Sequence, residues 1–249
     1  MNPVKHITAY ELNARYIPAI ITSMPFLLGG YFLLRNEETK DIMAFLLSLK
    51  FLGYLSLSFI GLYFYAQLIR TISKFYERKY FHDASGFPTT YFMLYANREY
   101  SEAFKGAFRD RVKKEFGFVL LSKNEEDTDP SEGQRRLNDV TKQIILKVGD
   151  GRLVGKHNQW YGFFRNLIGG TTFALIGSMV NILVGIYILH HKGLVILSCL
   201  MVVVYGMLLL FRRSLIVQHA EAYARQLYAE FMMERLRPQK TIKSAKEII

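Results

Sequence analysis

The sequence predicts an all-α integral membrane protein in which two transmembrane helical hairpins flank a helical cytoplasmic insert. Three observations support this fold class: four long uncharged runs, an uneven placement of charge between them, and helical periodicity in the polar segments. The chain has 249 residues, of which 51% are hydrophobic and 14% aromatic. So much apolar surface excludes a disordered chain. The lone cysteine, Cys199, excludes a disulfide-stapled module.

Four apolar runs are each long enough to cross a bilayer. The hydrocarbon layer is about 30 Å thick and requires roughly 20 helical residues. The predicted spans are 16–34, 42–69, 166–189 and 193–211, and Lys50 is the only charge within them. We therefore expect transmembrane hairpins over 16–69 and 166–211, because the remaining polar chain is too short to cover four such helices.

Charge placement predicts the orientation. Most Lys and Arg residues lie in 1–15, 70–165 and 212–249, whereas the loops 35–41 and 190–192 carry few. Positive charge favours the cytoplasmic side. We therefore expect both termini and the insert 70–165 to be cytoplasmic, and the protein to lie in the inner membrane. The net charge of +11 is then mainly an orientation signal, and no specific nucleic-acid binding is expected.

The polar segments have the periodicity of helices. In 101–116, Phe104, Phe108, Val112 and Phe116 recur every four residues and form one apolar face. Asp129, Pro130 and Glu132 form a helix start, with an N-cap, a proline at the first position and a glutamate at the third. The helix that follows is expected to bury Leu137, Val140 or Thr141, Ile144 and Val148. The tail 212–249 is expected to extend the fourth span as one long helix up to Pro238.

Two polar residues fall inside predicted spans. Lys50 either faces a cavity, a partner or an ion path, or it reaches outward to the headgroups. Asn181 either lines a pore or hydrogen-bonds across a helix interface, and we favour helix packing.

The third span also carries a dense pattern of small residues, which permits close approach of a second helix. The pattern comprises Gly170, Ala174, Gly177 and Ser178. The partner helix belongs either to the same chain or to another copy. In the first span, Pro18 and Pro25 free backbone carbonyls, which suits either a hinge or a static bend.

Basic residues of the insert are candidates for binding a phosphate-rich ligand. They are Arg109, Arg111, Lys113, Arg135 and Arg136. The alternative is a solvated face beside anionic headgroups. The segment 157–166 contains Trp160 and Arg165 at the start of the third span, a composition typical of an interface anchor.

Catalytic and metal-binding motifs are not seen. The sequence has no HExxH, no cysteine pair and no G-x-S-x-G, and 149–151 lacks the lysine of a phosphate-binding loop. We therefore expect a protein that is not an enzyme and that needs no metal or cofactor.

The layout of spans 16–34, 42–69, 166–189 and 193–211 resembles the four-transmembrane effectors of bacterial antiphage signalling systems. The resemblance is one of architecture and implies an effector that compromises the membrane when triggered. We accordingly expect an oligomeric, non-enzymatic effector that forms or gates a pore in response to a cytoplasmic protein or a nucleotide-type signal. The expected partners are the lipid bilayer and further copies of the chain. The alternative is a membrane-anchored scaffold or sensor subunit that recruits cytoplasmic proteins.

Overall fold

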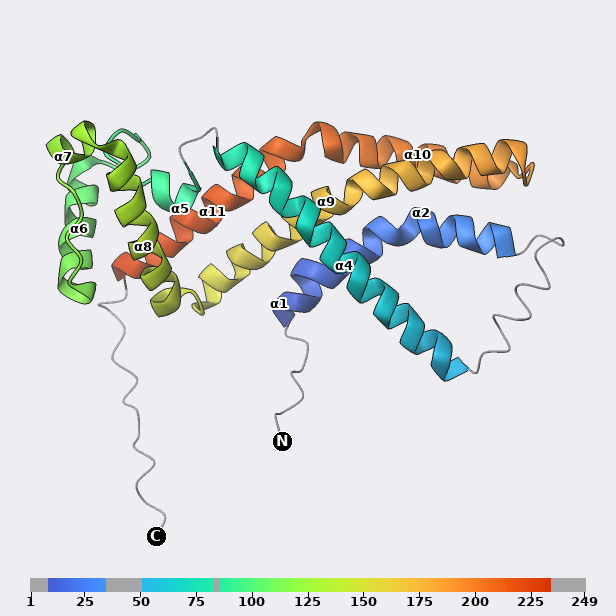
Figure 1. The fold of residues 1–249 in the computed structure, drawn as a ribbon, viewed down its shortest axis with the longest axis horizontal. Helices are drawn as coiled ribbons and strands as arrows, with labels where there is room; N and C mark the ends of the chain where they lie inside the picture. The colour runs from blue at the N-terminus through green and yellow to red at the C-terminus, as the bar shows by residue number, and fades with distance from the viewer. Residues whose placement is uncertain (1–8, 35–50, 83–85, 234–249) are drawn as a thin grey trace, which may run out of the picture. The chain divides into compact units, whose positions relative to one another are not determined.

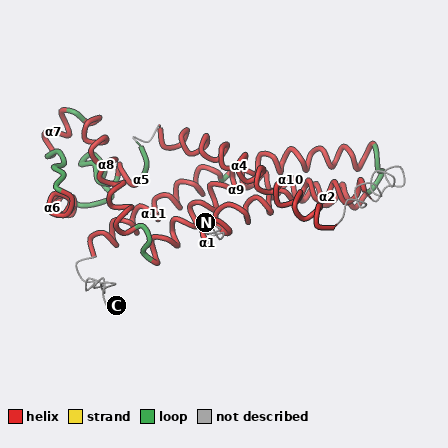
Figure 2. The backbone as a smooth tube through the Cα atoms, turned by 60° about the horizontal axis from the view of Figure 1, so that its bottom comes forward, coloured by secondary structure: helices red, strands yellow, loops and turns green. Residues whose placement is uncertain are grey.

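The computed structural model describes residues 9–34, 51–82 and 86–233, with the side chains of 9, 34, 51–58 and 82 left out. Within these residues every regular element is a helix (Figures 1 and 2). The elements are α1 (Ala9–Glu11), the π-helix η1 (Leu12–Tyr16), α2 (Ile17–Leu34), α4 (Phe51–His82), α5 (Pro88–Tyr91), α6 (Glu102–Phe116), α7 (Lys123–Thr128), α8 (Pro130–Val148), α9 (Arg152–Tyr187), α10 (Lys192–Leu210) and α11 (Arg212–Met233). Lys50, the loop 35–41 and the segment after Met233 lie outside the described residues.

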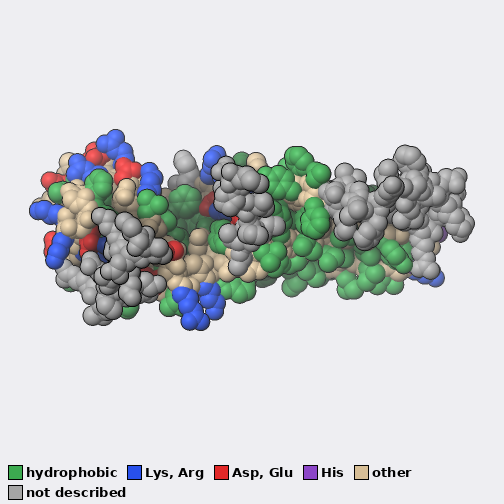
Figure 3. Space-filling model, turned by 90° about the horizontal axis from the view of Figure 1, so that it is seen from below, with side chains coloured by type: hydrophobic (Ala, Val, Ile, Leu, Met, Phe, Trp, Pro, Cys, Tyr) green, Lys and Arg blue, Asp and Glu red, His purple; other side chains and the backbone are tan. Residues whose placement is uncertain are grey.

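The chain divides into two compact units. The apolar unit comprises Met1–Ser85 and Lys156–Ala220, and the polar unit comprises Gly86–Gly155 and Glu221–Ile249. Hydrophobic side chains cover much of the visible surface of the apolar unit, whereas charged side chains gather on the polar unit (Figure 3). The polar unit thus begins later and ends earlier than the predicted insert 70–165, and it also includes part of α11.

Three helical stretches in the described parts are long and apolar enough to cross a membrane: Leu12–Leu33, Arg152–Tyr187 and Lys192–Leu210. They overlap the first, third and fourth predicted spans, so the expectation of membrane helices is supported at this level. The second predicted span overlaps the start of α4, which continues without a break to His82.

The third predicted span, 166–189, forms part of a longer helix, because α9 begins at Arg152 and ends at Tyr187. One prediction differs from the structure. The fourth span and the tail are not one unbroken helix. Phe211 leaves helical geometry (φ −91°, ψ 7°), and its N–H is shared between the carbonyls of Met207 and Leu209. This tightened turn separates α10 from α11.

In the described part of the apolar unit, two clusters of buried side chains join the helices. Ala19 of α2 packs with Ala66 and Ile69 of α4, where small side chains allow close contact. Elsewhere, Phe81 of α4 packs with side chains of α9 and α11. The partners in the second cluster are Tyr161, Ile168, Ile216 and Ala220.

In the described part of the polar unit, α6, α8 and α11 each contribute an apolar face to a shared core. The α6 face is the predicted one, with Phe108 and Val112 fully buried, and Ser101 caps the helix by accepting from the Phe104 N–H. The α8 start is also as predicted, because Asp129 accepts from the Glu132 N–H and Pro130 follows it. The expected α8 residues line this core, as do Leu227, Tyr228 and Phe231 of α11.

Two aliphatic residues of α8 test this core. Ile144 is fully buried, whereas Leu146 is 80% exposed. Ile144→Ala should lower the free energy of unfolding of the polar unit by about 2–5 kcal/mol, because it removes buried methyl groups and leaves a cavity. Leu146→Ala should change it by less than about 0.5 kcal/mol. Pulse proteolysis of the full chain in detergent, followed at sites within α6–α8, measures both. Equal effects would contradict the assignment of the core.

Candidate functional site

The two prolines of the first apolar helix leave carbonyls that other helices satisfy. Proline has no N–H, so Pro18 and Pro25 cannot donate to the carbonyls of Ala14 and Ile21, four residues earlier. Asn166 Nδ2, on α9, donates to the Ala14 oxygen at 2.6 Å. The backbone before Pro18 is itself a π-helix, in which the Ile17 N–H reaches the Leu12 oxygen five residues back.

The second carbonyl is satisfied from a different helix. Tyr205 Oη, on α10, donates to the Ile21 oxygen at 2.7 Å. Within a bilayer an unmet carbonyl is costly, and neighbouring helices commonly supply the missing donor. Because both carbonyls are occupied by side chains from other helices, the geometry favours a static bend over a hinge.

Asn181 of α9 makes a similar contact with α2, one helical turn after Ile21. It is buried, and its Nδ2 donates to the Pro25 oxygen at 2.6 Å. A Cβ on Gly29 would lie 2.2 Å from its Oδ1, so the glycine leaves the space that the amide fills. Tyr65 of α4 likewise donates to the Thr22 oxygen at 3.1 Å. Asn181 therefore acts as a packing residue between helices, the favoured alternative.

The small residues of α9 lie against helices of the same chain. A Cβ on Gly170 would meet Thr22 of α2 at 2.4 Å, and one on Gly177 would meet the ring of Phe26 at 3.0 Å. Ala174 and Ser178 are fully buried, and the Ser178 hydroxyl donates to the Ala174 oxygen at 2.8 Å. In the structure, these small residues therefore pack against helices of the same chain, which was one of the two alternatives.

A buried ion pair joins α4 to α9. Glu77 of α4 accepts a short hydrogen bond from the Tyr161 hydroxyl. Arg165 Nη1 lies 3.3 Å from Glu77 Oε1, and its guanidinium lies 5.4 Å from the centre of the Tyr161 ring. Sequence reasoning missed Glu77, although it is the one acidic residue between Arg70 and Lys79. That isolated acid in a basic run was the available signal.

Arg109 belongs to a buried charge cluster in the polar unit. Its Nη2 lies 2.7 Å from Oε2 of Glu126, which is almost fully buried, and its guanidinium stacks 3.9 Å from the centre of the Tyr95 ring. Nearby, buried Lys105 donates to the Asn97 carbonyl, and burial together with the positive charge of Arg109 lowers the pKa of its amine. The Arg109 donors are therefore used inside the fold.

The other predicted basic residues do not form a single site with Arg109. Arg111 is buried, and its Nη1 donates to the Met232 carbonyl at 2.7 Å, which ties α6 to α11. Lys113 is exposed on α6. Only Arg135 and Arg136 come together, on α8, where both pair with Glu132 at 2.6 and 2.8 Å.

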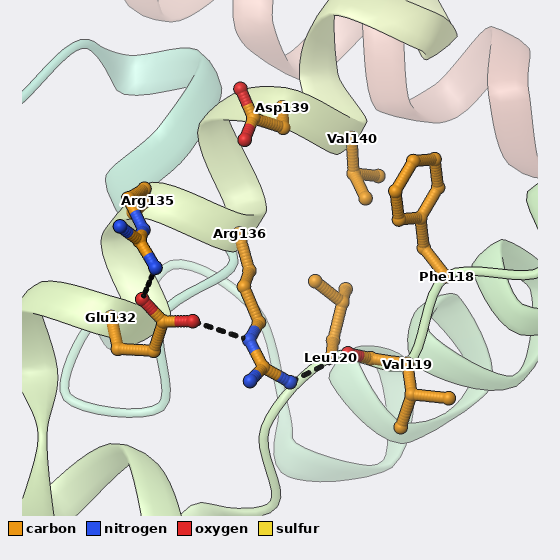
Figure 4. A pocket seen from close by; sticks show the side chains of 8 residues that line it. All are labelled: Phe118, Val119, Leu120, Glu132, Arg135, Arg136, Asp139 and Val140. Atoms are coloured by element: carbon orange, nitrogen blue, oxygen red, sulfur yellow. Dashed lines mark hydrogen bonds and ion pairs between the residues drawn. The ribbon is translucent and has the colours of Figure 1, made fainter.

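These two arginines border a groove of about 400 Å³ between α8 and the extended segment after α6 (Figure 4). Arg136 Nη1 reaches across to the Val119 carbonyl at 3.2 Å. Phe118 and Val119 form the exposed apolar wall of the groove. The other lining residues are Leu120, Asp139 and Val140. In the described parts of the chain no three His, Cys, Asp or Glu side chains are grouped to hold a metal ion.

Fold and site together define a helical protein with apolar helices long enough to span a membrane and a separate polar unit that carries a charged groove. No family model, curated protein or solved structure matches the chain. The assignment of function therefore depends on the residues described above.

A pair of glycines tests the close contact between α4 and α9. A Cβ on Gly169 would lie 2.8 Å from the Ile69 oxygen and 3.0 Å from the Ser73 nitrogen, both backbone atoms of α4, whereas one on Gly206 meets nothing within 4 Å. Gly169→Ala should destabilise the protein by about 1–3 kcal/mol, because the helices must move apart. Gly206→Ala should be neutral or stabilising by up to about 1 kcal/mol. Thermal unfolding in one detergent compares them, and a harmless Gly169→Ala would contradict the contact.

A double-mutant cycle tests the satisfied carbonyl of Ile21. Tyr205→Phe should destabilise the protein by about 1–2 kcal/mol, because it leaves that carbonyl without a donor. In a Pro25→Ala background the restored N–H can bond Ile21, so the same substitution should have a smaller effect. Unfolding midpoints of the four proteins in one detergent give the coupling. Tyr187→Phe, at an exposed residue of α9, is the matched control. Additive effects would argue against the shared carbonyl.

Proposed function

We propose that the protein is a four-span, non-enzymatic inner-membrane protein whose polar unit receives a partner on the cytoplasmic side. The spans are 16–34, 42–69, 166–189 and 193–211, arranged as two hairpins. The close approach of Gly185 on α9 to Val195 on α10, where a Cβ would meet the valine at 2.8 Å, supports the second hairpin.

The basic end of α4 supports the cytoplasmic placement of both termini and of the polar unit. Lys74, Arg78 and Lys79 are exposed there, whereas Glu77 is turned inward and neutralised by Arg165. The exposed face of this helix end therefore carries more net positive charge than the composition of the segment indicates. Positive charge beside a span favours the cytoplasmic side.

A difference between the polar side chains of the two units supports the receiver function. In the apolar unit, polar side chains donate hydrogen bonds to carbonyls of the first helix. These side chains belong to Asn166, Asn181 and Tyr205. The polar unit, in contrast, presents an open groove with exposed Phe118 and Val119 beside Arg135 and Arg136. A membrane-anchored scaffold or sensor needs such a surface and needs no polar path through the bilayer.

A pore-forming effector, as in the antiphage systems that the layout resembles, is the second candidate. It requires an oligomer, and one observation favours association of copies. An apolar hollow of about 430 Å³ lies between α2 and α4, lined by residues that include Phe26, Leu27 and Leu62, with Ser23 beside them. A helix of another copy seated there would place Ser23 at the interface.

Site-specific cross-linking and a membrane-potential dye distinguish the two candidates. A photo-reactive residue at Val119, in the groove, should give a discrete protein adduct in cells. The adduct should be lost with Arg136→Glu, which reverses the charge beside the groove, and kept with Lys113→Glu, an exposed control on α6. The dye signal should not change on expression.

Each readout has a contrary result. Collapse of the membrane potential on expression would favour the pore-forming effector over the receiver. Failure of Val119 to give any protein adduct, with expression at normal level, would contradict the groove as the receiving surface.

A further inference from the structure

A second hollow, in the apolar unit, lies beside the only tryptophan of the chain. It has a volume of about 350 Å³ and lies between the first turns of the N-terminal apolar helix and the early turns of α9. It is lined by Asn13, Ile17, Lys156, Gln159, Trp160 and Phe163. The lining thus combines one cation, two amides, two aromatic rings and one aliphatic side chain.

The hollow lies where both of its helices change from polar to apolar. Asn13 and Ile17 belong to the first turns of the candidate span Leu12–Leu33. On α9, the last charge before the long uncharged run is Arg165, and the lining residues lie within the three turns that precede it. If these helices cross a membrane, the hollow lies at the level of the lipid headgroups.

The aromatic wall of the hollow is pre-arranged. Trp160 is 46% exposed, and its ring stacks on Phe164 with centroids 6.0 Å apart and meets Phe163 edge-on at 5.8 Å. Lys156 is exposed and makes no ion pair with any residue that the structure describes. Among the described residues, no acidic side chain pairs with this positive charge, which lies beside an ordered apolar wall.

We propose that this hollow binds one anionic phospholipid. Lys156 would face the phosphate, the amide of Asn13 would hydrogen-bond to the headgroup or glycerol oxygens, and the headgroup-proximal part of the acyl chains would lie against Ile17, Trp160 and Phe163. The volume is in the range of pockets that hold small organic groups. Aromatic rings and lysine at headgroup depth are the residues that contact lipid there. A free phosphate would leave the apolar wall uncovered, so the site fits the whole lipid.

The proposal does not depend on what the polar unit binds, and the single tryptophan allows a direct test. The full chain is reconstituted in vesicles of phosphatidylcholine containing a rising fraction of brominated phosphatidylglycerol, and in the converse mixture with brominated phosphatidylcholine. Bromine quenches tryptophan on contact, so the emission reports the lipid beside Trp160. Phosphatidylglycerol should be preferred about fivefold, the size expected for one lysine at an anionic surface.

Two variants and a competitor identify the source of that preference. Lys156→Gln should abolish the preference while leaving quenching by both lipids. Lys192→Gln, a lysine at the start of α10 that does not line this hollow, should leave the preference unchanged. Millimolar glycerol phosphate should not reduce it, because the acyl chains are part of the ligand. Lack of quenching by either lipid, equal quenching of the wild type, or a preference that persists in Lys156→Gln would each overturn the proposal. So would competition by glycerol phosphate.

Discussion

The apolar unit depends on the carbonyls that prolines free in its first helix. Pro18 and Pro25 each remove one backbone donor, and side chains of two other helices replace those donors: Asn166 at the Ala14 oxygen and Tyr205 at the Ile21 oxygen. In an apolar surrounding each unmet carbonyl would be expensive. The hydrogen bonds therefore specify which helices approach the first one and at which height, something that non-directional apolar packing does only weakly. The glycines of α9 then permit the distance that these bonds require.

Buried charge is handled in the same way in both units. Each unit contains an ion pair that lies beside an aromatic ring. In the apolar unit Glu77 pairs with Arg165 beside Tyr161. In the polar unit Glu126 pairs with Arg109 beside Tyr95. A buried pair adds little net stability, but loss of one partner leaves an uncompensated charge. Such pairs therefore specify one arrangement of helices more than they strengthen it. They also bury charged side chains that the sequence alone would place at the surface, available to ligands.

Patterns along single helices could be predicted well. The α6 face and the capped start of α8 both follow from local periodicity and capping, and the structure has them. The candidate site could be predicted only in pieces. Arg109, Arg111 and Arg136 are equivalent as basic residues in the sequence, yet the first two are buried in internal contacts and only the third borders a groove. The break at Phe211 also escaped notice, because no proline or glycine marks it.

The sequence by itself determined the helical class, the apolar stretches long enough for a membrane, and the local start and face of the helices in the polar unit. These properties depend on residues a few positions apart, whose spacing is set by helix geometry. Only the tertiary structure decided which polar groups are used in contacts within the fold and which remain available to a ligand. Asn181 meets Pro25 156 residues away, and Glu77 meets Arg165 88 residues away. Such pairings depend on how the helices pack, which no local pattern encodes.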